Sequence, residues 1–153
     1  MTASAKIVNA ERLLAKLAKL PDEVRDKIKA AMEAQAEEIT AMMRRLAADP
    51  KIDASIGWRW GASAPRGSMA VASVQASADD DMTITIFAGG GAAFYARWWE
   101  FGTDPRVQKK TGRRTGVMPA NPFFYVSFRA NRKNAKRRIQ YALRAAGRKV
   151  AAS

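Results

Sequence analysis

The spacing of apolar residues predicts two long helices, with a segment of strands between them. In the first, apolar side chains recur at alternating intervals of four and three from Pro21 to about Ala48, as on one face of a helix. The stripe consists of Ile28, Met32, Ile39, Met42 and Leu46, with Gln35 completing the series. Proline suits a first helical turn, and Asp49-Pro50 is expected to end the helix. The stripe is shorter than four heptads, which favours a helix lying on a sheet over a self-associating coiled coil.

A shorter amphipathic segment precedes this helix. Asn9 is a good N-cap, and four leucines follow it on one side of a predicted helix: Leu13, Leu14, Leu17 and Leu20. Residues 1–20 are therefore a candidate for a separate helical arm.

Three runs of alternating residues in the middle of the chain predict strands. They lie near residues 56–60, 69–75 and 83–86, and the segments between them are rich in glycine, proline and aspartate. Short connections of this kind favour an antiparallel meander over parallel crossovers. The triplet Asp79-Asp80-Asp81 lacks the ligand spacing of a calcium loop, so it is interpreted as a solvated hairpin tip.

An aromatic helical turn is predicted from Ala92 to Phe101, after a glycine run at 89–91 that we interpret as a flexible connection. Gly102 would end the turn at the C′ position. Two aromatic tracks share the helical spacing, one with Phe94, Trp98 and Phe101 and the other with Tyr95 and Trp99. The simpler interpretation puts the first track in the core, with Glu100 accepting hydrogen bonds. The alternative leaves Tyr95 or Trp99 exposed until a neighbouring subunit buries it.

The last helix is predicted after Pro122. Its apolar face contains Phe124, Phe128, Ala135, Ile139, Leu143, Ala146 and Val150. Together these elements predict a single α+β domain over residues 1–153, with the C-terminal helix packed on the sheet.

Composition narrows the possible functions. The chain of 153 residues contains neither cysteine nor histidine, which removes thiolate metal sites and the common nucleophile–base pairs. We therefore expect no enzyme and no cofactor. No window approaches the roughly 20 apolar residues that span a bilayer, so a membrane partner is not expected.

Positive charge is concentrated in the last third of the chain. Residues 101–153 hold 14 Lys/Arg against the single acidic residue Asp104, which accounts for the whole net charge of +13. Within this third, residues 104–117 form a loop longer than compact domains need. Its cations are Arg106, Lys109, Lys110, Arg113 and Arg114. The loop is predicted to be mobile in the free protomer and to order against an acidic surface or nucleic acid.

A two-part motif resembles the neck, or tail-completion, proteins of long-tailed bacteriophages. The family's signature reads roughly Tyr-Ala-x-x-x-Glu-Phe-Gly-Thr, then a variable loop, then Pro-x-x-Pro-Phe. Here the matching residues are Tyr95, Ala96, Glu100, Phe101, Gly102 and Thr103, followed by Pro119, Pro122 and Phe123. The chain departs from the commonest pattern in doubling a tryptophan at Trp98-Trp99 and in its strongly basic loop.

The resemblance implies a structural virion protein without catalytic activity. Such proteins assemble as rings where the tail meets the head, complete or terminate the tail and join it to the capsid connector. A hexamer is implied because phage tails are sixfold. The implied partners are other copies of the chain, the tail tube protein, a head-closure, connector or tail terminator protein, and packaged DNA in the channel. The motif residues, together with Trp98 and Trp99, are the candidate subunit interface.

A different class of function remains open from the sequence. The many cations after Phe128 would allow the last helix to bind phosphate groups, as in a basic nucleic-acid-binding protein. No helix-turn-helix spacing or zinc motif accompanies them.

Overall fold

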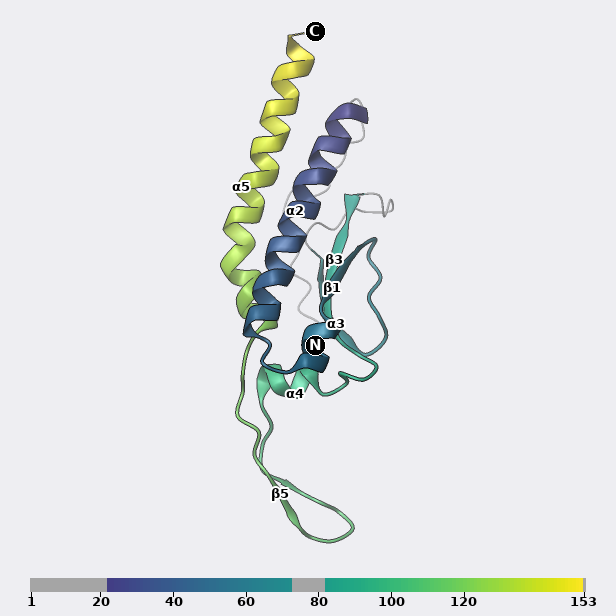
Figure 1. The fold of residues 1–153 in the computed structure, drawn as a ribbon, viewed down its shortest axis with the longest axis vertical. Helices are drawn as coiled ribbons and strands as arrows, with labels where there is room; N and C mark the ends of the chain where they lie inside the picture. The colour runs from purple at the N-terminus through teal and green to yellow at the C-terminus, as the bar shows by residue number, and fades with distance from the viewer. Residues whose placement is uncertain (1–21, 73–81, 153) are drawn as a thin grey trace.

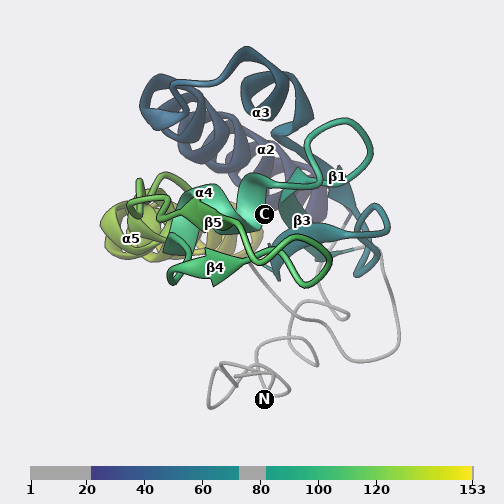
Figure 2. The same cartoon turned by 90° about the horizontal axis from the view of Figure 1, so that it is seen from below.

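Two long antiparallel helices run side by side in the computed structural model, which describes residues 22–72 and 82–152 (Figure 1). Helix α2 is Asp22–Leu46 and helix α5 is Phe124–Ala151. A three-stranded sheet lies on the other side of α2, so that α2 is the middle layer (Figures 1 and 2). The predicted α+β class, with a long helix near each end, is confirmed. The predicted N-terminal arm and aspartate tip lie outside the described residues.

The sheet is antiparallel, but its order is not that of a meander. Its strands are β1 (Gly57–Trp60), β2 (Ser68–Ala72) and β3 (Ile84–Gly89), in the order β1-β3-β2. The connection from β1 to β2 covers residues 61–67, which is longer than a tight hairpin and allows the chain to pass the central strand. Strand β3 is therefore the most buried, and Ile84 and Ile86 are fully enclosed.

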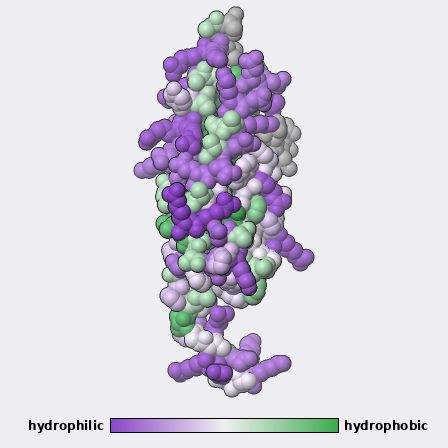
Figure 3. Space-filling model, in the orientation of Figure 1, coloured by the Kyte–Doolittle hydropathy of each residue, from purple (hydrophilic) through white to green (hydrophobic). Residues whose placement is uncertain are grey.

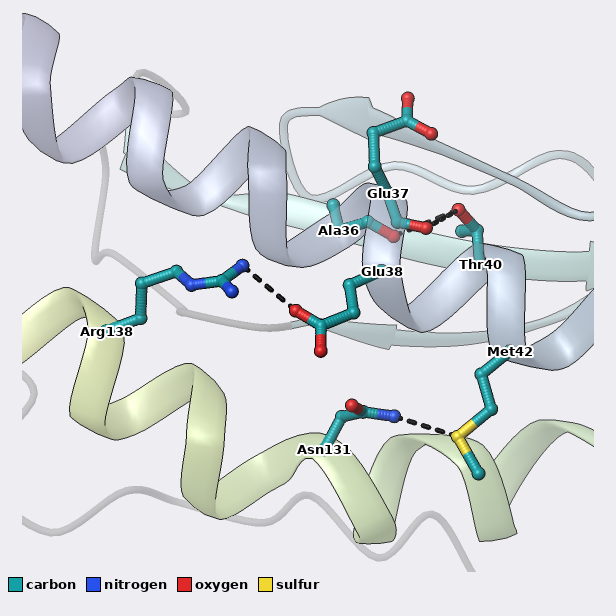
Figure 4. A network of polar contacts seen from close by, with 7 residues as sticks. All are labelled: Ala36, Glu37, Glu38, Thr40, Met42, Asn131 and Arg138. Atoms are coloured by element: carbon teal, nitrogen blue, oxygen red, sulfur yellow. Dashed lines mark hydrogen bonds and ion pairs between the residues drawn. The ribbon is translucent and has the colours of Figure 1, made fainter.

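Helix α5 packs along α2 rather than on the sheet, which corrects the expected layering. The face of the sheet was already covered by α2, and the narrow apolar stripe of α5 fits another helix better than a broad sheet. Polar contacts also join the two helices (Figure 4): Asn131 donates to the sulfur of Met42 at 3.1 Å, and Arg138 pairs with Glu38 at 3.0 Å. On α2 itself, the Thr40 hydroxyl donates to the carbonyl of Ala36.

The buried stripe of α2 follows the expected residues only in part. Ile28, Met32 and Ile39 are buried as predicted, but the stripe then continues through Met43 and Ala47. The predicted positions Met42 and Leu46 are half-buried and exposed, respectively. A strict seven-residue repeat drifts around a straight helix of 3.6 residues per turn, so its last members leave the buried side.

A short helix that the sequence analysis missed follows α2. Helix α3 is Pro50–Ser55, and Asp49 is its N-cap, accepting hydrogen bonds from the backbone N–H groups of Lys51 and Ile52. Asp49-Pro50 was expected to end the preceding helix. These residue types are equally an N-cap and a first-turn proline, and here they begin a helix.

The basic segment forms a hairpin rather than an irregular loop. Strands β4 (Arg106–Val107) and β5 (Arg114–Gly116) pair antiparallel and project from the body, at the end opposite the C-terminus (Figure 1). Every residue from 104 to 117 is exposed. Among the described residues, no helix is long and apolar enough to cross a membrane.

Candidate assembly interface

The carboxylate of Glu100 joins the two halves of the motif. Glu100 lies in α4 (Ala96–Phe101) and is 4% exposed. It accepts hydrogen bonds from the backbone N–H groups of Phe123 (2.8 Å), Phe124 (2.9 Å) and Tyr125 (3.0 Å). The first N–H groups of a helix have no partner within it, and a negative charge also complements the helix dipole. Glu100 thus acts as the cap of α5 from a distant part of the chain, a role that agrees with the expectation that it accepts hydrogen bonds.

Backbone contacts hold the same junction closed on either side of Glu100. The N–H of Thr103 donates to the carbonyl of Met118 at 2.9 Å, and the Met118 N–H donates to the Thr103 hydroxyl at 3.0 Å. The N–H of Asn121 donates to the carbonyl of Trp99 at 2.8 Å. The chain therefore leaves α4 and returns to α5 as two adjacent segments, and the hairpin projects from their far end.

Gly102 is required where these two segments approach each other. Its backbone has φ +71° and ψ −177°, a combination that is essentially restricted to glycine. A Cβ at this position would lie 2.8 Å from the nitrogen of Ala120 and 2.9 Å from the carbonyl oxygen of Met118. Gly102 ends α4, as expected, and it also allows the close backbone approach.

The two aromatic tracks at α4 face the opposite way from the favoured prediction. Phe94, Trp98 and Phe101 were expected in the core, but they are 64%, 41% and 57% exposed. Tyr95 and Trp99 are half-buried and pack against the core. The inward side of the turn is formed by Ala93, Ala96 and Glu100, all buried. The small alanines let α4 lie close to β3, and this fixes the larger rings on the outside.

The three exposed rings follow one another at spacings of four and three residues, and we call them the aromatic stripe (Phe94, Trp98 and Phe101). Phe94 and Trp98 meet edge to face at 5.8 Å, and Phe101 lies 5.7 Å from the ring of Tyr125. The guanidinium of Arg106 sits 5.1 Å from the Trp98 ring centre, so the base of the hairpin is in contact with the stripe.

Two further exposed apolar residues, Val107 and Val117, lie on the hairpin's two arms. Of the remaining motif residues, Pro119 and Pro122 are exposed, Thr103 is half-buried and Phe123 is fully buried. Phe123 is therefore a core residue in this protomer, while the prolines flank the junction at its surface.

A second carboxylate, which the sequence analysis did not single out, anchors the start of the aromatic turn. The Tyr95 hydroxyl donates to Asp49 at 2.9 Å, and Asp49 is also the N-cap of α3. Hydrogen bonds from the Ile52 N–H and from Tyr95 lower the pKa of Asp49. Burial, together with the bond to Asp49, raises the pKa of Tyr95. The sequence signal for the role of Asp49 was the Asp49-Pro50 pair, because this pair of residue types is typical of a helix start.

The comparison with protein families decides what kind of protein carries this junction. Residues 11–102 match a family described as Bacteriophage HK97-gp10, putative tail-component, and the match covers more than half of the chain. The chain belongs to this family. No curated protein and no solved structure matches it.

Membership agrees with the resemblance to neck and tail-completion proteins, and it makes the protein a bacteriophage tail component. The matched residues include α4, Glu100 and Gly102. The proline half of the motif and the hairpin lie beyond the matched residues. Glu100 nevertheless ties that second half to the first through three hydrogen bonds.

Proposed function

We propose that this protein is a structural part of the phage neck, without catalytic activity, that forms a homo-oligomeric ring at the head–tail junction. The ring completes or terminates the tail and joins it to the capsid connector. Its partners are other copies of the chain, the tail tube protein and a head-closure, connector or tail terminator protein. A hexamer fits the sixfold symmetry of phage tails. Membership of a tail-component family supports the virion location.

The aromatic stripe is the observation that carries this proposal. Single exposed apolar residues are ordinary on a protein surface, but three large exposed rings within eight residues of one segment are not. Tryptophan, phenylalanine and arginine are the residue types enriched where proteins meet, and Trp98 with Arg106 combines two of them. The stripe is therefore suited to be covered by another subunit.

A closed ring also limits which surfaces pair. Ring interfaces are heterologous, so the stripe must meet a different patch on the neighbouring copy rather than the same stripe. An isologous contact through two stripes would stop at a dimer. Helix α4, which carries Trp98 and Phe101, lies at the end of the body from which the hairpin projects (Figure 1).

A deletion of the gene from the phage genome, complemented in trans, tests the proposed role. We expect cells without the protein to accumulate filled heads and separate tails, and expect the parent protein to restore joined particles. Normal joined particles without the protein would contradict the proposal.

A second candidate function follows from the outer side of α5. Seven cations there are exposed: Arg129, Arg132, Lys133, Lys136, Arg137, Arg144 and Arg148. This surface supports the alternative of a nucleic-acid-binding protein that contacts phosphates through α5. Duplex binding near physiological salt that is lost when these cations are removed would favour it.

A further inference from the structure

The hairpin tip, residues 108–114, differs in chemistry from the hairpin base. Four of its seven residues are cations, and the others are Gln108, Thr111 and Gly112, so the tip has no apolar side chain. The space-filling view shows the projecting end as mainly hydrophilic (Figure 3). The base, in contrast, carries Val107, Val117 and the contact between Arg106 and Trp98.

Backbone and side-chain hydrogen bonds give the tip a defined shape. The N–H groups of Gln108 and Gly112 donate to the carbonyls of Arg113 (2.9 Å) and Gln108 (2.8 Å). The Thr111 hydroxyl donates to the Gln108 side chain at 2.7 Å, and Gly112 takes the φ of +65° that the turn needs. The four cations are therefore held together on a short turn.

Within the described residues, no carboxylate neutralises the charge of the tip. In the part of the chain that the structure describes, no carboxylate forms an ion pair with Lys109, Lys110, Arg113 or Arg114. After Asp104 the sequence contains no further aspartate or glutamate. The described part of the protomer therefore leaves the charge of the tip open to a partner of opposite charge.

The composition of the tip points to phosphates rather than to a protein surface. Protein interfaces are built around aromatic or apolar anchors and are depleted in lysine, whereas the tip has no anchor and two lysines. Contacts to a nucleic-acid backbone come from lysine, arginine, threonine and glutamine side chains together with backbone N–H groups. The tip contains each of these groups.

We propose that the hairpin tip binds the phosphate backbone of duplex DNA without sequence preference. The inference rests on the proposed neck location, because a ring at the head–tail junction surrounds the path of the genome. The aromatic stripe and the hairpin base then contact neighbouring subunits, and the tip binds the DNA. One tip offers at most four charges, so each contact is weak, and the ring multiplies it.

The test compares two variants that lose the same charge from different places. The tip variant carries Lys109→Ala, Lys110→Ala, Arg113→Ala and Arg114→Ala. The control carries Arg132→Ala, Lys133→Ala, Lys136→Ala and Arg137→Ala on α5, so both have a net charge of +9, from +13 minus four. Binding to a fluorescent DNA duplex is measured by anisotropy over a range of salt concentrations, and melting curves check folding. A double variant, Lys109→Gln with Lys110→Gln, is included as a milder change.

For the parent we expect binding that weakens with salt, at a slope of about 0.9 in log K for each phosphate contacted. The tip variant should lose roughly three units of this slope, the double variant about half of that, and the α5 control less than one. Equal losses in both four-alanine variants, a loss confined to the α5 control, or no binding by the parent would overturn the inference. Binding by the parent to polyglutamate but not to DNA would overturn it in favour of an acidic protein partner. None of these outcomes depends on whether heads and tails join. A failure of the DNA-binding inference can therefore be distinguished from a failure of the proposed neck role.

Discussion

The carboxylate of Glu100 lies 2.8 Å from the backbone nitrogen of Phe123, a residue 23 positions later in the chain. This contact turns two sequence fragments into one junction, because it fastens the last turn of α4 to the first turn of α5. Together with Gly102, Glu100 sets the direction in which the hairpin leaves the body. The motif that resembles neck proteins is therefore largely a structural device in this protomer.

Replacing Glu100 tests this capping role. Glu100→Gln keeps the size of the side chain but removes its charge, and its amide nitrogen takes the place of an oxygen that accepts at least one of the three backbone hydrogen bonds. We expect the free energy of unfolding to fall by about 2 kcal/mol, because buried donors lose a charged acceptor. Urea denaturation measures it. The control is Glu38→Gln, which breaks a half-exposed pair with Arg138 and should cost less than about 1 kcal/mol. Equal stability of the two variants would rule out the capping role.

Gly102 and Gly112 form a matched pair for the second prediction. Both have positive φ, but a Cβ on Gly112 would meet nothing within 4 Å, whereas a Cβ on Gly102 would meet backbone at 2.8 Å. Gly112→Ala should cost about 1 kcal/mol from backbone strain alone. Gly102→Ala should cost at least about 1 kcal/mol more, and Gly102→Val should be worse still. Thermal melting compares them. If Gly102→Val melts like the parent yet fails to join tails, Gly102 serves assembly rather than folding.

The aromatic stripe should matter for assembly and not for folding. Trp98→Ser with Phe101→Ser removes two exposed rings, so the melting temperature should stay within a few degrees of the parent. The variant should lose ring formation, as measured by light scattering and electron microscopy, since interface aromatics carry much of the binding energy. Tyr141→Ser, at an exposed aromatic on α5, is the control and should assemble normally. Rings that form equally well from both variants would exclude the stripe as the interface.

The contact between Tyr95 and Asp49 predicts a pH effect. The lowered pKa of Asp49 means that its contribution to stability is present above about pH 4 and is lost as pH falls through the folded-state pKa. The raised pKa of Tyr95 means that its contribution is present below about pH 10 and is lost as pH rises through the folded-state pKa. In Tyr95→Phe the pKa of Asp49 should rise but stay below normal, because the Ile52 N–H still donates. NMR titration of the Asp49 carboxyl carbon measures this, and an unchanged pKa would contradict the assignment.

The periodicity of apolar residues predicted the long helices well, but it could not show which face of the short helix α4 is buried. The 3.6-residue spacing located both long helices, since each buries a long stripe such as Ile28, Met32 and Ile39. In α4 both aromatic tracks have the same spacing, so hydropathy alone could not tell which faces inward. The deciding residues were small or charged, Ala93, Ala96 and Glu100, and their burial depends on contacts with β3 and α5.

The order of the strands and the layering of the helices could not be predicted from local sequence patterns either. The alternation of residues identified all three strands, but their order depends on how the chain from Gly61 to Gly67 passes β3. The place of α5 on α2 depends on which face was already covered. In the basic segment, cations and glycines hid the pairing of Arg106 with Gly116 that makes it a hairpin.

The position of the protein in the assembled particle tests the central proposal most directly. A short tag fused to the chain, labelled with gold and imaged by cryo-electron microscopy in joined phage particles, would locate it. We predict a single site at the head–tail junction, with density consistent with a ring. Label on the capsid surface, along the tail or at the tail tip, or the absence of the protein from particles, would contradict the account.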